Sequence, residues 1–344
     1  MHHANTTLRI HLRSETHDDE SDALVSVQVR LIFQWIFNSV LCELVDIFGT
    51  ITNIINIVCF VKLGIRDPVN ISLLGLASSD LGCLITLIWT NICYNPAFNG
   101  LDLPFSPIDF QYLTGTRLHI VFTRVTGCIT AFITLERCLC VAMPLKVKRI
   151  FTPTRVSTII AVLYMAVIAN MLPMYYVTRL SVIFSPARNK TIIGFVYANN
   201  RDRVEGATCA VSCVFVPLSS FTIIVVCTLT LVAKLRRKSE WRQNVGSVQT
   251  EKATCRDQKT TKMVIVISSL FIVCFLPVCL VMLAMLIDKE FSIIGKRRNV
   301  FICVFSVCFL LESINSAMNI FIYYYMSTKY RNMLQQMIPL LRPK

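Results

Sequence analysis

The sequence predicts an all-α membrane protein, a seven-transmembrane helix bundle followed by a short amphipathic eighth helix. Three observations predict it: an apolar composition, seven apolar segments long enough to cross a bilayer, and basic residues gathered in the short connections between them. Of the 344 residues, 54% are hydrophobic and only 16% are charged, which is too apolar for a soluble domain of this size. The segment lengths also argue against a soluble protein with several buried helices.

Each predicted span contains roughly the 20 apolar residues that a helix needs to cross a bilayer. Residues 1–31 are expected to form an extracellular N-terminal tail, residues 32–326 the bundle, and residues 327–344 a cytoplasmic interfacial helix and tail. The spans are expected at 32–63, 70–93, 112–140, 156–178, 208–235, 261–288 and 299–326.

The distribution of Lys and Arg predicts the orientation of the bundle. Basic residues are most frequent in the connections that follow the first, third and fifth spans, as expected of a cytoplasmic face. Two glycosylation sequons, at Asn5 and Asn189, fall on the opposite side. We therefore expect a multi-pass plasma-membrane glycoprotein with its N-terminus outside. The net charge of +14 is explained by these connections and does not indicate a nucleic-acid partner.

Polar residues inside the spans are costly in lipid and are expected to face the interior of the bundle. Asn53 lies in the first span, Asp80 in the second, and the seventh presents Asn315, Asn319 and Tyr323 on one helical face. We expect a hydrogen-bonded network at mid-membrane, with water or a cation at Asp80. The sequence has no metal-ligand spacing, nucleophile–base set or phosphate loop, so neither an enzyme nor a cofactor is predicted.

Five features occur in an order that resembles the rhodopsin-like (class A) G-protein-coupled receptors. They are Asn53, the LASSD segment ending at Asp80, LERC, CFLP and NIFIY, and the resemblance extends over residues 32–337. The phrases LERCLCVAMPLKVKRIFTP and NIFIYYYMSTKYR also resemble chemosensory-type receptors of gastropod molluscs. The resemblance implies a receptor that binds an extracellular ligand in the outer half of the bundle and activates a heterotrimeric G protein at the cytoplasmic face.

The resemblance also implies roles for individual residues. Glu136 would neutralise Arg137 in the inactive receptor and release it to the G protein in the active one. Asp257 lies 20 residues, or about 30 Å of helix, before Pro277, and would be a second partner of Arg137. The alternative is that Asp257 is a solvated loop charge. With the aromatic switch Phe275 beside the proline kink, the activation set is Glu136, Arg137, Asp257, Phe275, Pro277, Asn319 and Tyr323.

The chain departs from the family pattern at several positions. Tyr112 stands where a cysteine is expected at the outer end of the third helix, and residues 179–207 contain no cysteine. The family's extracellular disulfide is therefore missing, and we expect the outer face to be held more loosely. Val225 and Ile320 replace a Tyr and a Pro of the pattern, which puts efficient activation in question.

Charged residues in the outer half of the spans are candidates for the ligand site, because unpaired charges are not tolerated at this depth. One hypothesis is a basic wall on the third helix facing an acidic wall on the first and seventh, which suits a zwitterionic or acidic ligand such as an amino acid or short peptide. The alternative is that these residues pair with one another and contact no ligand. The candidates are Arg117, His119, Arg124 and Glu312, with Glu43 and Asp46 on the first helix.

Other functional classes are weighed against a chemosensory receptor. A receptor for a neuropeptide or transmitter would share every motif, and only the ligand discriminates. A retinal-binding opsin needs a lysine in the seventh span, and residues 299–326 contain none. A transporter or channel, the alternative from a different class, would show broken helices or internal repeats, which the sequence lacks.

Overall fold

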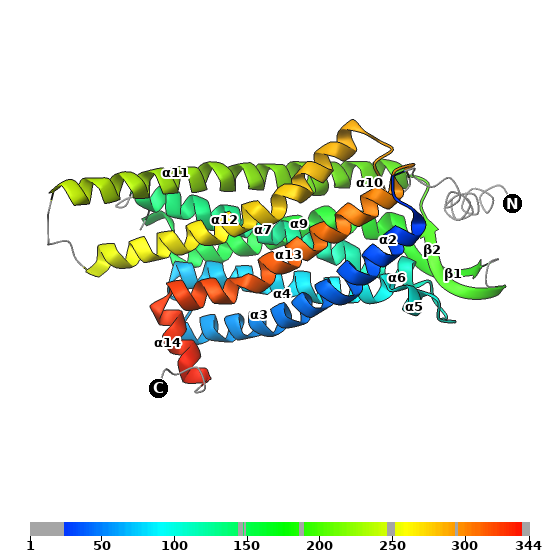
Figure 1. Ribbon diagram of the computed structural model, residues 1–344, viewed down its shortest axis with the longest axis horizontal. Coiled ribbons are helices and arrows are strands. Elements are labelled where there is room, and N and C mark those ends of the chain that lie inside the picture. The colour runs from blue at the N-terminus through cyan, green and yellow to red at the C-terminus, as the bar shows by residue number, and fades with distance from the viewer. Residues whose placement is uncertain are drawn as a thin grey trace.

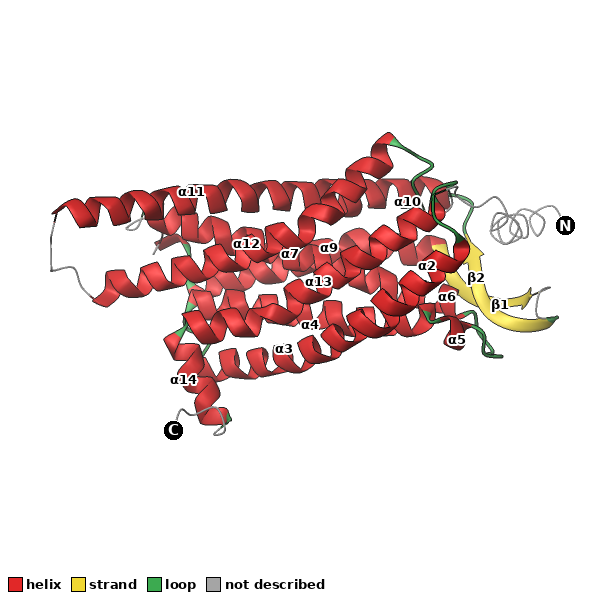
Figure 2. Ribbon diagram, in the orientation of Figure 1, coloured by secondary structure: helices red, strands yellow, loops and turns green. Residues whose placement is uncertain are grey.

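The computed structural model describes residues 24–143, 147, 149–185, 189–245, 252–292 and 295–338. Seven helices in this part of the chain are long and apolar enough to cross a membrane. They form an elongated bundle with a two-stranded hairpin at one end and the short helix α14 (Thr328–Met337) at the other (Figure 1). Among the described residues, strands occur only at the hairpin end (Figure 2). The predicted seven-helix bundle is confirmed, and the two ends are called the hairpin end and the α14 end below.

Several spans are built from consecutive helical segments. The first span comprises α2 (Val27–Gln34), the π-helical segment η1 (Trp35–Cys42) and α3 (Glu43–Leu63), the third comprises α6 (Pro107–Gln111), η2 (Tyr112–Thr116) and α7 (Arg117–Ala142), and the fifth comprises α10 (Arg201–Cys209), η3 (Ala210–Phe215) and α11 (Val216–Val245). Each of the other four spans is a single helix. The second is α4 (Pro68–Tyr94), the fourth α9 (Pro153–Val177), the sixth α12 (Lys252–Ile287) and the seventh α13 (Arg298–Met326). The short helix α5 (Pro96–Asn99) lies after the second span.

All seven helical spans begin earlier than the apolar runs predict, and capping residues set the starts of the first and the third. The first helix begins at Val27 rather than at residue 32, and the Ser26 side chain accepts a hydrogen bond from the Val29 amide. The third begins at Pro107 rather than at 112, with the Ser106 hydroxyl accepting from Asp109. The helical part of the chain therefore reaches into the expected tail of residues 1–31.

The outward faces of the helices are apolar. Leu44, Met165, Leu229 and Val273 are each at least 64% exposed, although they lie in the middle of long helices. Such patches would drive aggregation in water, whereas the hydrocarbon of a bilayer accommodates them without cost. The outward surface thus supports the assignment of these helices to a membrane.

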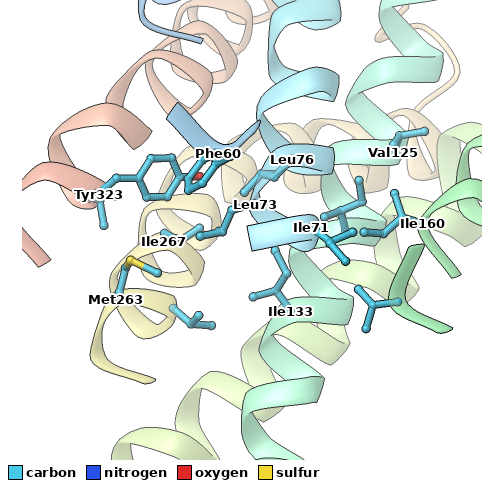
Figure 3. Close-up of a cluster of buried hydrophobic side chains, with 14 of the residues drawn as sticks. Phe60, Ile71, Leu73, Leu76, Val125, Ile133, Ile160, Met263, Ile267 and Tyr323 are labelled. Carbon is cyan, nitrogen blue, oxygen red and sulfur yellow. The ribbon is translucent and has the colours of Figure 1, made fainter. Parts of the chain in front are cut away.

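The largest buried cluster of apolar side chains joins most of the helices (Figure 3). Figure 3 shows Phe60 against Tyr323, with α4, α7, α9 and α12 contributing the neighbouring side chains. Tyr330 and Leu334 of α14 belong to the same cluster, which therefore extends to the α14 end of the bundle. The labelled members are Phe60, Ile71, Leu73, Leu76, Val125, Ile133, Ile160, Met263, Ile267 and Tyr323.

The predicted eighth helix is α14 (Thr328–Met337). The Ser327 hydroxyl accepts a hydrogen bond from the Tyr330 amide and caps its first turn. Tyr330 and Leu334, one turn apart, are both buried, whereas Lys329 on the opposite face is exposed. This one-sided burial is the pattern of an amphipathic helix that lies against the end of the bundle.

The connection between the fourth and fifth spans is a β-hairpin that the sequence analysis did not foresee. Strands β1 (Thr178–Ser185) and β2 (Lys190–Tyr197) pair antiparallel, with Thr178 opposite Tyr197. Their sequences, TRLSVIFS and KTIIGFVY, are rich in the β-branched and aromatic residues that favour strands. Asn189, in the turn, adopts the left-handed conformation that asparagine tolerates (φ 46°).

Noncovalent contacts attach the hairpin to the start of the third span. The Ser106 amide donates to the carbonyl of Ile193 (3.0 Å), and the Ile193 amide donates to that of Pro104 (2.9 Å). The ring of Tyr112, at the position of the missing cysteine, packs edge-on against Phe195, with centroids 5.6 Å apart. All cysteines that the structure describes are free. Hydrogen bonds and ring packing therefore join the segments that the family's disulfide would join, and how loosely the outer face is held stays a prediction.

Candidate functional site

Asp80 is the centre of a buried hydrogen-bond network between three helices. Its Oδ1 accepts from the hydroxyls of Thr126 on α7 (3.1 Å) and Ser316 on α13 (3.2 Å), and its Oδ2 accepts from the Asn319 amide (2.8 Å). Asp80 itself is completely buried. Three donors satisfy a carboxylate that would otherwise be very costly at this depth. Thr126 was not foreseen, because a threonine within a span has no distinctive pattern.

The network continues through α3 to the α14 end. The Asn53 amide donates to the carbonyls of Gly49 and Ser316, at 2.9 Å each. The Asn56 amide donates to Asn53 (3.3 Å), and the Tyr330 hydroxyl donates to the Asn56 Oδ1 (2.5 Å). Burial raises the pKa of the Tyr330 phenol, so its hydroxyl remains protonated and available as a donor. Side-chain contacts therefore connect α14 to Asp80 through the first and seventh spans.

Asn315 and Tyr323 face the interior of the bundle as expected, but no hydrogen bond in the described part of the chain joins either side chain to the Asp80 network. Asn315 is buried, but among the described side chains Ser316, the next residue, contacts Asp80. Tyr323 is completely buried between the rings of Phe60 and Tyr330, and its hydroxyl has no hydrogen-bond partner within the described part of the chain. The tyrosine therefore packs into the core and leaves a buried polar atom unused.

Glu136 and Arg137 form an ion pair at the α14 end of α7. The Arg137 Nη2 lies 2.5 Å from the Glu136 Oε1, and both side chains are buried. Pairing offsets part of the desolvation cost of the two charges. Asp257 lies within α12, but its side chain is outside the described part of the structure. Its suggested contact with Arg137 therefore stays a prediction.

Phe275 lies in a small aromatic cluster beside the proline of α12. Its ring stacks on that of Phe271, with centroids 4.1 Å apart and planes 11° from parallel. Cys274 of α12, Ala131 of α7 and Ile224 of α11 complete the cluster. Pro277 lies inside α12, where it cannot donate the usual helical hydrogen bond. The sixth span is thus weakened next to its contact with the third and fifth.

A cavity of about 170 Å³ opens between the helices on the hairpin side of Asp80. Three of the four predicted ligand candidates, His119, Arg124 and Glu312, line it. His119 Nε2 lies 2.9 Å from Glu312 Oε2, so these two residues form a buried pair across the cavity. The complete lining is Leu87, Thr90, Thr116, His119, Ile120, Thr123, Arg124, Cys213, Val278, Met282, Phe305, Phe309 and Glu312.

Arg117, the fourth candidate, points elsewhere. Its Nη1 donates to the Met174 carbonyl (2.5 Å), its Nη2 lies 3.5 Å from Glu205, and its guanidinium covers the rings of Tyr112 and Tyr175. Arg117 and Arg124 are seven residues apart in sequence, so they share one face of the helix but lie about 10 Å apart along its axis. Arg117 therefore binds partners on α9 and α10 and does not line the cavity, contrary to the expectation that it contributes to the ligand site.

The acidic wall expected on the first helix is also absent from the cavity lining. Asp46 is completely buried and accepts a hydrogen bond from Asn91 of α4 (3.4 Å). Glu43 is only partly buried and, like Asp46, does not line the cavity. Asp46 therefore lies at the contact between the first helix and α4. The cavity therefore receives its only described carboxylate from Glu312.

Comparison with known protein families assigns the fold. The family model described as "7 transmembrane receptor (rhodopsin family)" matches residues 52–323. The chain is a member of the rhodopsin family of seven-transmembrane receptors. A search of curated proteins returns no significant match. The family is one of G-protein-coupled signalling receptors in the plasma membrane, so the coarse identification made from the motifs is confirmed.

The two predicted glycosylation sites differ in what the structure describes. Asn189 is exposed in the turn of the hairpin, where an oligosaccharyltransferase can reach it. Asn5 lies outside the described residues. The use of either sequon stays a prediction.

Replacing Tyr330 by phenylalanine is expected to lower the receptor's free energy of unfolding by about 1 kcal/mol, because Asn56 loses its donor while the ring packing is kept. Thermal unfolding of purified receptor measures the change. Tyr325→Phe is the matched control, since Tyr325 is 74% exposed. Equal losses of stability in the two variants would contradict a role for the Tyr330–Asn56 hydrogen bond.

Proposed function

We propose that the receptor binds a small ligand in the cavity at the hairpin end and activates a heterotrimeric G protein at the α14 end. One observation carries this proposal: a single helix, α7, brings Arg124 to the cavity and Arg137 to the opposite end of the bundle. Thirteen residues, or about 20 Å of helix, separate them. A small movement of α7 against its neighbours would therefore affect both sites.

In this proposal the hairpin end faces the outside of the cell. The exposed sequon at Asn189 lies there, and the basic connections that the positive-inside rule assigns to the cytoplasm lie at the α14 end. Glu136 holds Arg137 in the inactive receptor. Separation of this pair exposes the guanidinium to the G protein, and the cluster around Phe271 and Phe275 adjusts as α12 moves.

A chemosensory role fits a small cavity between the helices, and the alternative is a receptor for a neuropeptide or transmitter. The described cavity has room for a small organic molecule, which favours the first possibility. A short peptide would have to bind mainly at the surface of the hairpin end. Responses to small molecules and to peptides therefore discriminate between the two.

The test is a G-protein activation assay in cells that express an N-terminally tagged receptor. Amino acids, carboxylic acids, amines and short peptides are applied, and ligand-independent signalling is recorded as well. We expect Arg137→Ala to abolish activation at unchanged surface expression. Arg149→Ala, which changes an exposed arginine at the same end, is expected to signal normally. Full signalling by Arg137→Ala would contradict the proposed coupling site.

A further inference from the structure

The polar side chains of the cavity are not all paired. His119 and Glu312 are joined by a hydrogen bond of 2.9 Å, and the hydroxyl of Thr123 also contacts His119 (3.3 Å). The cavity's only described carboxylate is therefore already engaged. The guanidinium of Arg124 contacts the Cys213 thiol but has no carboxylate partner in the lining.

Arg124 lacks the carboxylate partner that the other buried arginines of α7 possess. Arg117 pairs with Glu205 and Arg137 with Glu136, but no carboxylate in the described residues forms an ion pair with Arg124. Its side chain is only 7% exposed, and its Nε has no hydrogen-bond partner within the described part. A buried cation without a counter-charge costs several kcal/mol, so this site has a strong preference for an anion.

The remainder of the lining is mostly apolar and determines what can accompany the anionic group. Ile120, Val278, Met282, Phe305 and Phe309 contribute hydrocarbon and aromatic surface. An apolar cavity of about 150 Å³ accommodates a benzene molecule, and this cavity measures about 170 Å³. It therefore fits a compact apolar group of about that size attached to one charged head.

We propose that the ligand of this receptor is a small organic monocarboxylate. The carboxylate binds the guanidinium of Arg124, whose planar fork matches its two oxygens, and the apolar tail lies against Phe305 and Phe309. A zwitterionic ligand fits less well, since its ammonium group would compete with His119 for Glu312. The inference rests on the proposed ligand cavity and names the chemistry of its occupant.

The position of Arg124 also gives the bound carboxylate a route to the rest of the bundle. Arg124 lines a second, smaller cavity together with Phe271 and Phe275. An anion that draws the guanidinium toward the larger cavity removes a charge from beside this aromatic stack. The packing of α7 against α12 then depends on whether the carboxylate is bound.

The test measures the melting temperature of detergent-purified full-length receptor at neutral pH. The probes are hexanoate, benzoate and phenylacetate at millimolar concentration, each compared with its neutral amide and with benzylamine. We expect the acids to raise the melting temperature and the amides and amine to leave it unchanged. Stabilisation by the amides equal to that by the acids, or no stabilisation by any acid, would overturn the proposal.

Variants at Arg124 supply the second arm. With Arg124→Gln, we expect that an at least tenfold higher acid concentration is needed for the same rise in melting temperature. The empty variant is expected to be at least as stable as the empty wild-type receptor, because an uncompensated buried charge is removed. Arg124→Lys keeps the charge but loses the planar guanidinium, and its acid-dependent rise in melting temperature is expected to lie between those of wild type and Arg124→Gln. Arg203→Gln, at an exposed arginine of the same end, is the control and should match wild type. A marked loss of stability in empty Arg124→Gln would show a structural role and overturn the inference.

The two proposals fail in different ways. Acids that raise the melting temperature without any Arg137-dependent signalling would support the ligand assignment and contradict G-protein coupling. An Arg137-dependent response to an amine or a peptide, with none to the acids, would support coupling and overturn the ligand assignment.

Discussion

Arg117→Ala is expected to destabilise the receptor by about 3–5 kcal/mol and to remove most of it from the cell surface. Arg117 is 1% exposed and lies where the third, fourth and fifth spans meet at the hairpin end. Its loss leaves the Met174 carbonyl without this donor and opens a void beside Tyr112 and Tyr175. Glu205 keeps its second partner, Arg201 (2.9 Å), so lost packing accounts for much of the effect.

Surface labelling and thermal unfolding of the purified protein measure this change. Arg117→Lys keeps a charge near Glu205 but cannot cover two rings with a planar group, and its loss is expected to be smaller. Arg179→Ala is the control, since Arg179 is exposed on β1 at the same end of the bundle. An unchanged melting temperature for Arg117→Ala would show that the hairpin end does not depend on this residue.

Asp80→Ala is the second large effect, with an expected loss of about 3 kcal/mol. Alanine removes the acceptor of three buried donors, Thr126, Ser316 and Asn319, and each unsatisfied donor costs about 1–3 kcal/mol. The total is below the simple sum, because the Thr126 hydroxyl keeps its contact with Ser79 (2.8 Å).

Asp80→Asn is the informative comparison for this site. The amide keeps one acceptor oxygen in the same shape and avoids burying a charge, so we expect less than half of the loss seen with alanine. The melting temperatures of both variants, measured in the same detergent, provide the test. Equal losses for alanine and asparagine would mean that the carboxylate charge, and not its hydrogen bonds, stabilises the three-helix contact.

The hairpin end shows which noncovalent contacts join the segments that lack the family's disulfide. The absence of the disulfide could be predicted from the sequence, since Tyr112 replaces one cysteine and residues 179–207 contain none. The contacts found in its place could not be predicted, because they depend on the pairing of Ile193 with residues near Pro104 and on a ring contact between Tyr112 and Phe195. Each contact joins residues more than 80 positions apart in the chain.

The bundle itself, including α14, was determined by the sequence alone. A helix in lipid satisfies its own backbone hydrogen bonds, so an apolar run of sufficient length specifies a span without reference to any partner. The cost of polar groups in lipid predicted that Asp80 and Asn319 face the interior of the bundle. In the structure the Asn319 amide nitrogen lies 2.8 Å from the Asp80 Oδ2. Local capping explains the earlier helix starts at Val27 and Pro107, and α10 and α12 also begin 7 and 9 residues before the expected spans, at Arg201 and Lys252.

The partners of the polar side chains were decided only by the tertiary structure. Helical spacing put Arg117 and Arg124 on one face, yet Glu205 and the Met174 carbonyl capture the first and leave the second in the cavity. Helical spacing likewise could not show that Ser316, and not Asn315, donates a hydrogen bond to Asp80. The physical reason is that a periodicity fixes the direction of a side chain to within a broad arc. Which partner lies within hydrogen-bonding distance depends on how helices remote in sequence are rotated and placed against each other.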